Sequence, residues 1–226
     1  MLSKKIQAAL EGSSAIRAMF VEGKELAAKV GAENVFDFSL GNPATPAPES
    51  VKQAIKDLLD ETDPLVLHGY MSNSGYEDVR AAVAENLNSR FGTKFTGENI
   101  VMTVGAAGGI NIVFKAVLDP GDEVIVPANT YIATAWGVTY TGATPVFADC
   151  TADTWEIDPE ALEAKVTAKT RGIIGVHLYG QPFDYAGVRE VAEKHGLFVV
   201  EDCAQAHGAT YEGRNVGTLG ELGCFS

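Results

Sequence analysis

The sequence has few cysteines, no long apolar run and no cluster of basic residues. Its three cysteines, Cys150, Cys203 and Cys224, form no CxxC pair and no even-numbered framework, which favours a reduced, cytoplasmic protein. The first residues lack the apolar run of a signal peptide, and no stretch is long enough to span a membrane. The formal net charge of -13 argues against a nucleic-acid partner. We therefore expect small molecules as ligands.

The composition is that of an ordinary folded protein. The chain has 226 residues, of which 46% are hydrophobic and 21% are charged. This length suits one large α/β domain that buries its own core without staples or metals.

The first part of the chain predicts helices joined by a proline-rich loop. Residues 1–34 are helical in pattern, and Pro43, Pro46 and Pro48 make residues 35–50 a loop. Two amphipathic helices should follow, one from about Val51 and one over 79–91. We assign residues 1–50 to an N-terminal helical segment with its loop, and residues 51–226 to a large domain.

From about residue 99 onward, short apolar runs alternate with helical patterns. Such alternation predicts a mainly parallel sheet covered by helices on both faces, a three-layer α/β/α architecture. The expected strands are 100–104, 123–126, 144–147, 172–176 and 197–200, and the chain ends in a further strand-like stretch.

Two of the expected strand ends carry unusual residues, at the edge where open α/β sheets bind ligands. Residues 103–109 join a strand to a helix through glycines and alanines, and free N–H groups there suit a phosphate. The same residues also fit a tight, closely packed turn, and they match neither a Walker loop nor GxGxxG.

Asp202 follows the strand predicted at 197–200. A carboxylate there can hold a protonated ring nitrogen, as pyridoxal 5'-phosphate (PLP) requires, or can simply cap the next turn. Cys203 and His207 have no further metal ligands nearby in the sequence, so we expect no metal site.

Two family resemblances follow from longer motifs. Residues from about Gly121 to Ser226 resemble the DegT-type sugar aminotransferases, a branch of the fold-type I PLP enzymes, and residues 1 to about 120 resemble the class I, aspartate-aminotransferase-like branch. The DegT-like stretches are 121–127, 176–182, 201–208, 217–220 and 223–226, and the class I-like ones are Gly41-Asn42-Pro43, His68-Gly69-Tyr70 and 104–109. We expect a chimera that crosses over near 115–127, or a truncated chain; a natural ancestor with mixed features stays open.

The resemblance implies a PLP-transferase large-domain fold and a role for each matching residue. Asp202 would pair with the pyridine nitrogen, Gln205 would contact the ring hydroxyl, and Tyr131 would stack on the ring. The phosphate would be bound by Ala106, Ala107, Gly108 and the Ser226 hydroxyl. Tyr70 would reach a partner's cofactor phosphate in a homodimer, and Gly41 would meet the substrate carboxylate.

The sequence departs from the family pattern at the catalytic lysine. In DegT-like enzymes the Schiff-base lysine follows the matching serine, whereas here the last lysine is Lys194, on an expected surface helix. We therefore expect non-covalent PLP binding and weak or no transfer of amino groups between an amino acid and a keto acid or keto sugar. A non-catalytic folding or dimerisation module and another PLP reaction, such as sugar dehydration, stay open. The lack of GxGxxG counts against a nucleotide-binding Rossmann protein.

Overall fold

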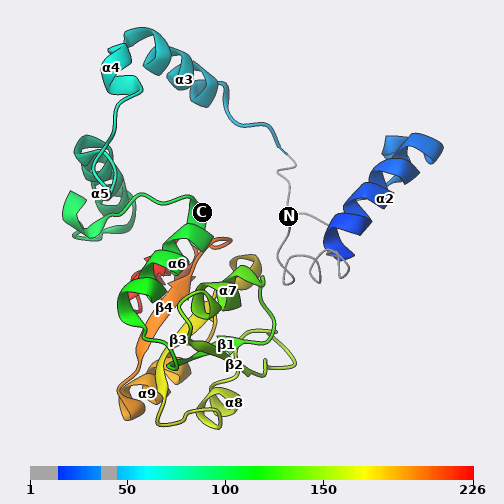
Figure 1. Cartoon of the computed structure of the whole chain (residues 1–226), viewed down its shortest axis with the longest axis vertical. Helices are drawn as coiled ribbons and strands as arrows, with labels where there is room; N and C mark the ends of the chain where they lie inside the picture. Colours follow the sequence, from blue (N-terminus) through cyan, green and yellow to red (C-terminus); the bar gives the residue numbers. More distant parts are fainter. Residues whose placement is uncertain (1–14, 37–44) are drawn as a thin grey trace, which may run out of the picture. The chain divides into compact units, whose positions relative to one another are not determined.

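The computed structural model describes residues 15–36 and 45–226 (Figure 1). The chain divides into two units, Met1–Tyr70 and Met71–Ser226. The described part of the first unit is helical, and the helix expected from about Val51 begins at Glu49, directly after Pro48. Its elements are α2 (Ala15–Val30), η1 (Ala32–Asn34), α3 (Glu49–Glu61) and α4 (Pro64–Leu67). The boundary predicted at residue 50 stays a prediction.

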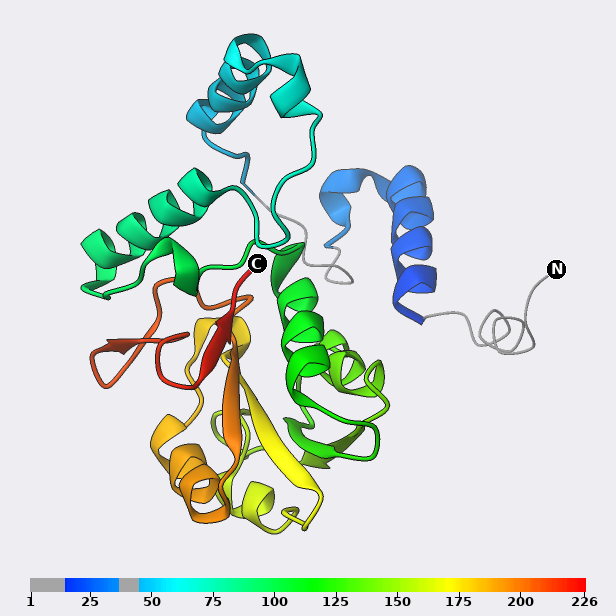
Figure 2. The same cartoon turned by 60° about the vertical axis from the view of Figure 1, so that its left-hand side comes forward.

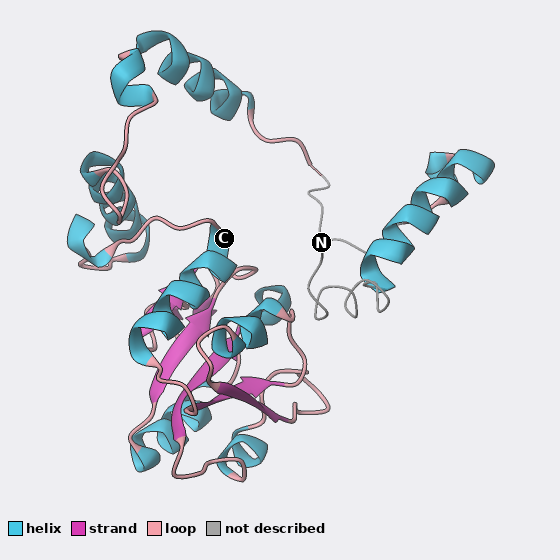
Figure 3. Cartoon of the chain, in the orientation of Figure 1, coloured by secondary structure: helices cyan, strands magenta, loops and turns pink. Residues whose placement is uncertain are grey.

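The second unit contains a five-stranded sheet in the order β2-β1-β3-β4-β7, in which every neighbouring pair is parallel (Figure 3). Its strands are β1 (Glu123–Pro127), β2 (Thr144–Ala148), β3 (Thr170–Val176), β4 (Phe198–Asp202) and β7 (Leu222–Cys224), with a small hairpin of β5 (Thr210–Tyr211) and β6 (Arg214–Asn215). Its helices are α5 (Glu77–Phe91), η2 (Gly97–Asn99), α6 (Gly105–Val117), α7 (Ala133–Thr139), α8 (Pro159–Glu163), η3 (Leu178–Gly180) and α9 (Tyr185–His195).

Side-chain alternation along the strands divides the core between two faces of the sheet. Ile173 and Val199 pack with residues of α8 and α9, whereas Ile174 and Val200 pack with residues of α6 and α7 (Figure 2). These two buried clusters confirm the three-layer α/β/α architecture. Among the described helices, none has the length and apolar character to cross a bilayer.

Local sequence signals set the ends of the connecting helices. Asp158 accepts a hydrogen bond from the Glu160 N–H at 2.9 Å, with Pro159 at the first helical position of α8. Asp184 caps α9 in the same way, and Gly196 ends it in the left-handed conformation, at φ 66°. Helix termination thus follows the rules used to read the sequence.

Residues 100–104 form no strand, which corrects the first predicted strand. Within the part of the chain that the structure describes, the segment pairs with no strand, and Met102 N–H donates instead to the Ser74 carbonyl at 3.0 Å. Val104 is 95% exposed, so its apolar character does not reflect burial here. An apolar run shows the capacity for a strand, whereas strand formation also requires a neighbour.

One buried carboxylate lies between β2 and α8. Glu156 is only 5% exposed, and burial raises its pKa to about 7, against a smaller lowering by the Leu178 N–H. The backbone around it is fixed by two contacts. The Thr151 N–H donates to the Glu156 carbonyl at 2.9 Å, and the backbones of Cys150 and Ile157 form an isolated antiparallel β-bridge. The folded chain therefore holds the Glu156 proton more tightly than the unfolded chain does.

We predict that Gly175→Ala destabilises the fold by about 1–3 kcal/mol through overpacking. A Cβ at Gly175 would lie 2.3 Å from the Phe183 ring, which is fully buried and stacks on His177. Gly108→Ala is the control, because a Cβ there meets no atom closer than 3.7 Å. Urea denaturation should show a lower midpoint than the wild type for Gly175→Ala but not for Gly108→Ala. Equal midpoints for the two variants would contradict the prediction.

We predict that Glu156→Gln becomes more stable relative to the wild type as the pH rises. A raised carboxyl pKa contributes stability below the unfolded value of 4.5, and this contribution is lost as the pH rises through about 7. The free energy of unfolding is measured for both proteins at pH 4.5 and at pH 8. Between these pH values, the stability of the variant relative to the wild type should rise by about 1–3 kcal/mol. Glu160→Gln, which removes an exposed carboxylate from α8, should show no such trend.

Candidate cofactor-binding site

A pocket opens at the carboxyl edge of the sheet, where the residues after β1, β3, β4 and β7 meet the N-terminus of α6. Its walls therefore come from five separate parts of Met71–Ser226, the edge at which parallel sheets bind ligands. The lining residues are Ala106, Ala107, Ile110, Thr130, Tyr131, Ala133, Val176, His177, Leu178, Asp202, Ala204, Gln205 and Ser226.

The first turn of α6 forms one end of the pocket. Gly105 adopts a left-handed φ of 67°, and a Cβ on it would lie 3.0 Å from the Ser226 hydroxyl oxygen. The Ala106 N–H donates to this oxygen at 3.2 Å, although the two residues are 120 positions apart. Backbone N–H groups, a hydroxyl and the positive end of a 13-residue helix thus converge at this end.

Asp202 lies at the tip of β4 and also lines the pocket. It is 7% exposed, and one carboxylate oxygen accepts from the Ala204 N–H at 3.1 Å while the other accepts from the Thr134 hydroxyl at 3.1 Å. Burial raises the pKa of Asp202, and these two hydrogen bonds and the proximity of His177 partly oppose that shift. No lysine or arginine of the described residues forms an ion pair with it. Such a carboxylate favours a cationic ligand group.

Thr134 is a site residue that the sequence analysis missed. It lies on α7, a short helix of small and β-branched residues that gave no helical signal in the sequence. Its buried hydroxyl lies 3.0 Å from the Thr130 hydroxyl and donates to Asp202, so Thr130 donates to Thr134 in turn. This chain of hydroxyls stabilises the ionised form of Asp202.

Gln205 and Tyr131 both line the pocket. The Gln205 side-chain oxygen accepts from the Tyr179 N–H at 2.7 Å, which fixes the amide and leaves its NH₂ group available as a donor. Tyr179 adopts a left-handed φ of 57°, a strained backbone conformation for a side chain of this size. Tyr131 is 66% exposed and presents an aromatic surface at the pocket.

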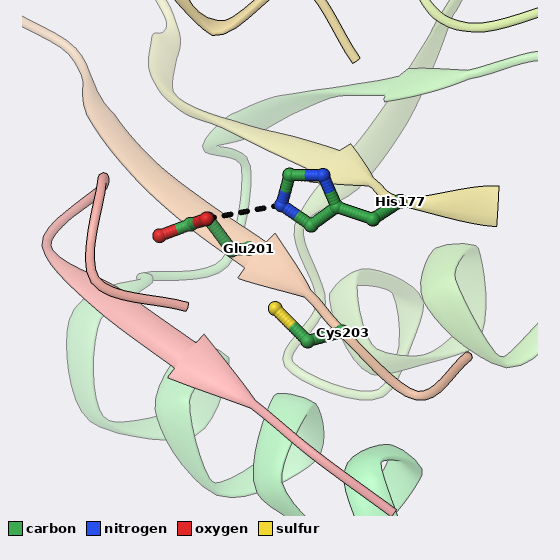
Figure 4. Close-up of side chains that lie close together, drawn as sticks. All are labelled: His177, Glu201 and Cys203. Atoms are coloured by element: carbon green, nitrogen blue, oxygen red, sulfur yellow. Dashed lines mark hydrogen bonds and ion pairs between the residues drawn. The ribbon is translucent and has the colours of Figure 1, made fainter. Parts of the chain in front are cut away.

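Three candidate metal ligands, His177, Glu201 and Cys203, have ligand atoms within 4.8 Å of one another (Figure 4), and His177 also lines the pocket. The Glu201 carboxylate accepts hydrogen bonds from three backbone N–H groups and from His177 Nε2 at 3.0 Å, so both oxygens are already in use. Burial raises the pKa of the Cys203 thiol far above its ordinary value, which disfavours the thiolate that metals bind. The arrangement is that of a buried, hydrogen-bonded carboxylate.

One predicted site residue of the unit Met71–Ser226 is absent from the pocket wall. Gly108 lies on α6 but does not line the pocket. Tyr70 is fully exposed and belongs to the unit Met1–Tyr70, and Gly41 lies outside the described residues. The roles expected of these residues stay predictions.

The residues present fit PLP. The molecule carries a phosphate at one end and a ring nitrogen that can be protonated at the other. The N-terminus of α6 and Ser226 offer donors for the phosphate. The buried Asp202 offers a carboxylate, and no lysine or arginine of the described chain forms an ion pair with it. The Gln205 amide and the Tyr131 ring lie on the same pocket.

Comparison with known proteins points to the same class. A curated relative, the UDP-N-acetyl-3-dehydro-alpha-D-glucosamine 3-aminotransferase of Acidithiobacillus ferrooxidans, is 50% identical over 127 residues, or 54% of this chain and 34% of the relative. The chain spans less than half the length of the curated relatives it matches. An aminotransferase structure from Eubacterium rectale superposes with a TM-score of 0.78 at 36% identity, covering 89% of this chain and 54% of that one.

An aspartate aminotransferase also matches, over most of the chain. A mutant of Thermus thermophilus aspartate aminotransferase superposes with a TM-score of 0.71 at 25% identity, covering 89% of this chain and 53% of that one. This likeness confirms the fold-type I assignment, while the crossover between two branches stays a prediction. The model of the DegT/DnrJ/EryC1/StrS aminotransferase family matches residues 79–226, and the chain therefore belongs to this family.

Proposed function

We propose that the unit Met71–Ser226 is the PLP-binding domain of an enzyme that transfers an amino group between an amino acid and a keto sugar. The observation that carries this proposal is one pocket lined both by anion-binding groups, the Ala106 N–H and the Ser226 hydroxyl, and by a buried carboxylate, Asp202. PLP is the cofactor of the aminotransferases that this chain resembles.

The two kinds of group have separate tasks in binding. The donors at α6 and Ser226 would hold the phosphate, and Asp202 would hold the proton on the ring nitrogen. When bound, PLP supplies an electron sink for removing a proton from the carbon that bears the amino group. Asp202 supports that chemistry by keeping a positive charge on the ring, and Thr134 supports it by keeping Asp202 ionised.

Two further side chains would orient the ring. The free NH₂ group of Gln205 would donate to the ring hydroxyl oxygen, because Tyr179 already occupies the amide oxygen. Tyr131 would cover one face of the ring. No lysine lines the pocket within the described chain, so we propose that this chain binds PLP without a covalent bond and turns over weakly or not at all.

The sugar substrate is proposed from the relatives. The curated protein from Acidithiobacillus ferrooxidans is an aminotransferase of a UDP-linked keto sugar, and a second relative, from Streptomyces kanamyceticus, acts on 2-deoxy-scyllo-inosose. A cyclic keto sugar or cyclitol is therefore the acceptor we propose. A homodimer completed by Tyr70 and a cytoplasmic location stay predictions.

We predict saturable binding of pyridoxamine 5'-phosphate to the wild type, measured by calorimetry. This form of the cofactor has no aldehyde and so cannot attach to surface lysines. Asp202→Asn should weaken binding about tenfold to a hundredfold, because a charge-assisted hydrogen bond contributes about 1.5–3 kcal/mol. Asp153→Asn, which removes an exposed loop carboxylate, should leave the affinity unchanged.

Two results would contradict the proposed function. The first is absence of saturable binding to the folded wild type, and the second is equal affinity of the wild type and Asp202→Asn. Borohydride treatment of the PLP-loaded chain, followed by mass analysis, tests the covalent state separately. A stoichiometric adduct at one lysine would contradict non-covalent binding.

We predict that Thr134→Val makes cofactor binding more sensitive to acid. Removing the hydroxyl donor raises the pKa of Asp202 further, so the neutral acid forms and affinity falls at a higher pH than in the wild type. At one mildly acidic pH the variant should bind about five- to tenfold more weakly. Thr134→Ser, which keeps the hydroxyl, should restore the wild-type pH profile of the dissociation constant. A parallel profile for Thr134→Val would show that the hydroxyl does not act through Asp202.

A further inference from the structure

The carboxylate of Glu201 has four hydrogen-bond partners. Its side chain is fully buried, and one oxygen accepts from the Leu219 and Gly220 N–H groups, both at 2.8 Å. The other oxygen accepts from the Gly217 N–H at 2.7 Å and from His177 Nε2 at 3.0 Å (Figure 4). The three backbone N–H donors tie the loop before β7 to the Glu201 side chain of β4.

Gly217 connects this carboxylate to the end of the chain. While its N–H donates to Glu201, its Cα side faces the Phe225 ring so closely that a Cβ would lie 2.3 Å from that ring. Gly217 adopts φ 80°, and a Cβ on Gly223 of β7 would lie 2.6 Å from the Gly217 Cα. Only a glycine fits between Glu201, Gly223 and Phe225 in this conformation.

Phe225 in turn precedes the serine of the phosphate end. Its ring centroid lies 5.1 Å from that of His207, and His207 Nε2 donates to the main-chain oxygen of Ser226 at 2.8 Å. The Ser226 hydroxyl then accepts from the Ala106 N–H at 3.2 Å. A continuous path of contacts therefore runs from Glu201 through Gly217 and Phe225 to the first turn of α6.

We propose that Glu201 is a positioning residue for the phosphate end of the pocket. By fixing Gly217 it fixes Phe225, and thereby it places the Ser226 hydroxyl against the Ala106 N–H. The role in cofactor binding rests on the proposed function, but the coupling between Glu201 and Ser226 does not. The neighbouring residue Asp202 lines the same pocket, so adjacent residues of β4 would serve the phosphate and the ring of one ligand.

The first test measures the coupling without a cofactor. Amide hydrogen exchange is followed by NMR in the wild type, in Glu201→Gln and in Gly217→Ala, which keeps the carboxylate but disturbs Phe225. The Ala106 amide should exchange about tenfold faster in both variants relative to the core amides of β1. Glu156→Gln is the matched control, since it also alters a buried glutamate but lies off the path, and it should leave Ala106 unchanged.

The proposal is overturned if the amides of Gly217, Leu219 and Gly220 lose protection in Glu201→Gln while Ala106 does not. An equal effect of Glu156→Gln on Ala106 would overturn it as well. If Glu201→Gln does not fold, Gly217→Ala decides the question. Unaltered exchange of the Ala106 amide in that variant would show that Phe225 does not couple Gly217 to Ala106.

The second test separates the phosphate from the ring. Affinities for pyridoxamine 5'-phosphate and for pyridoxamine, which lacks the phosphate, are compared in the same proteins. Glu201→Gln should reduce the preference for the phosphorylated form about tenfold and leave pyridoxamine binding unchanged. Equal weakening of both ligands would overturn the positioning role in favour of a general structural one. If the wild type binds neither ligand, the proposed function fails, and the Ala106 exchange still decides the coupling.

Discussion

The alternation of side chains at the end of β4 underlies the whole site. Val199, Glu201 and Cys203 face the α8 and α9 side of the sheet, whereas Val200 and Asp202 face the α6 and α7 side. A hydrogen-bonded carboxylate can therefore be buried on one face, and a ligand-facing carboxylate can open into the pocket on the other. A shift of this strand by one residue would exchange the two groups. The pairing of β3 with β4 through Val176 and Asp202 holds the register.

The central strands and the fold class could be predicted from the sequence because burial on both faces leaves a continuous apolar run. Residues 172–176 and 197–200 carry this signal, and both lie in or next to strands of the parallel sheet. The same signal failed at 100–104, where the residues are apolar but have no strand neighbour within the described chain. An apolar run shows that a segment is able to form a buried strand, whereas strand pairing depends on a partner elsewhere in the chain.

The site was only partly predictable for a related reason. Asp202 and the glycine-rich turn at α6 could be identified because each has a chemical signature within a few residues. Thr134 could not, because its role depends on a hydrogen bond to a residue 68 positions away. The same limit applies to the Tyr179 contact that orients Gln205, 26 positions away. Sequence patterns reveal which groups are unusual, whereas their partners emerge only from the fold.

Asp202 and Ser226 differ in how they are held. Asp202 is held by two direct hydrogen bonds on its carboxylate, from the Ala204 N–H and from the Thr134 hydroxyl of α7. Ser226 also has two direct hydrogen bonds, from His207 Nε2 and from the Ala106 N–H, but the preceding Phe225 packs against Gly217, a residue with no side chain to adjust. In the function proposed above, the two faces of β4 would therefore have separate tasks. Glu201, on the buried face, would support binding of the anion, and Asp202, on the open face, would set the charge state of the ring.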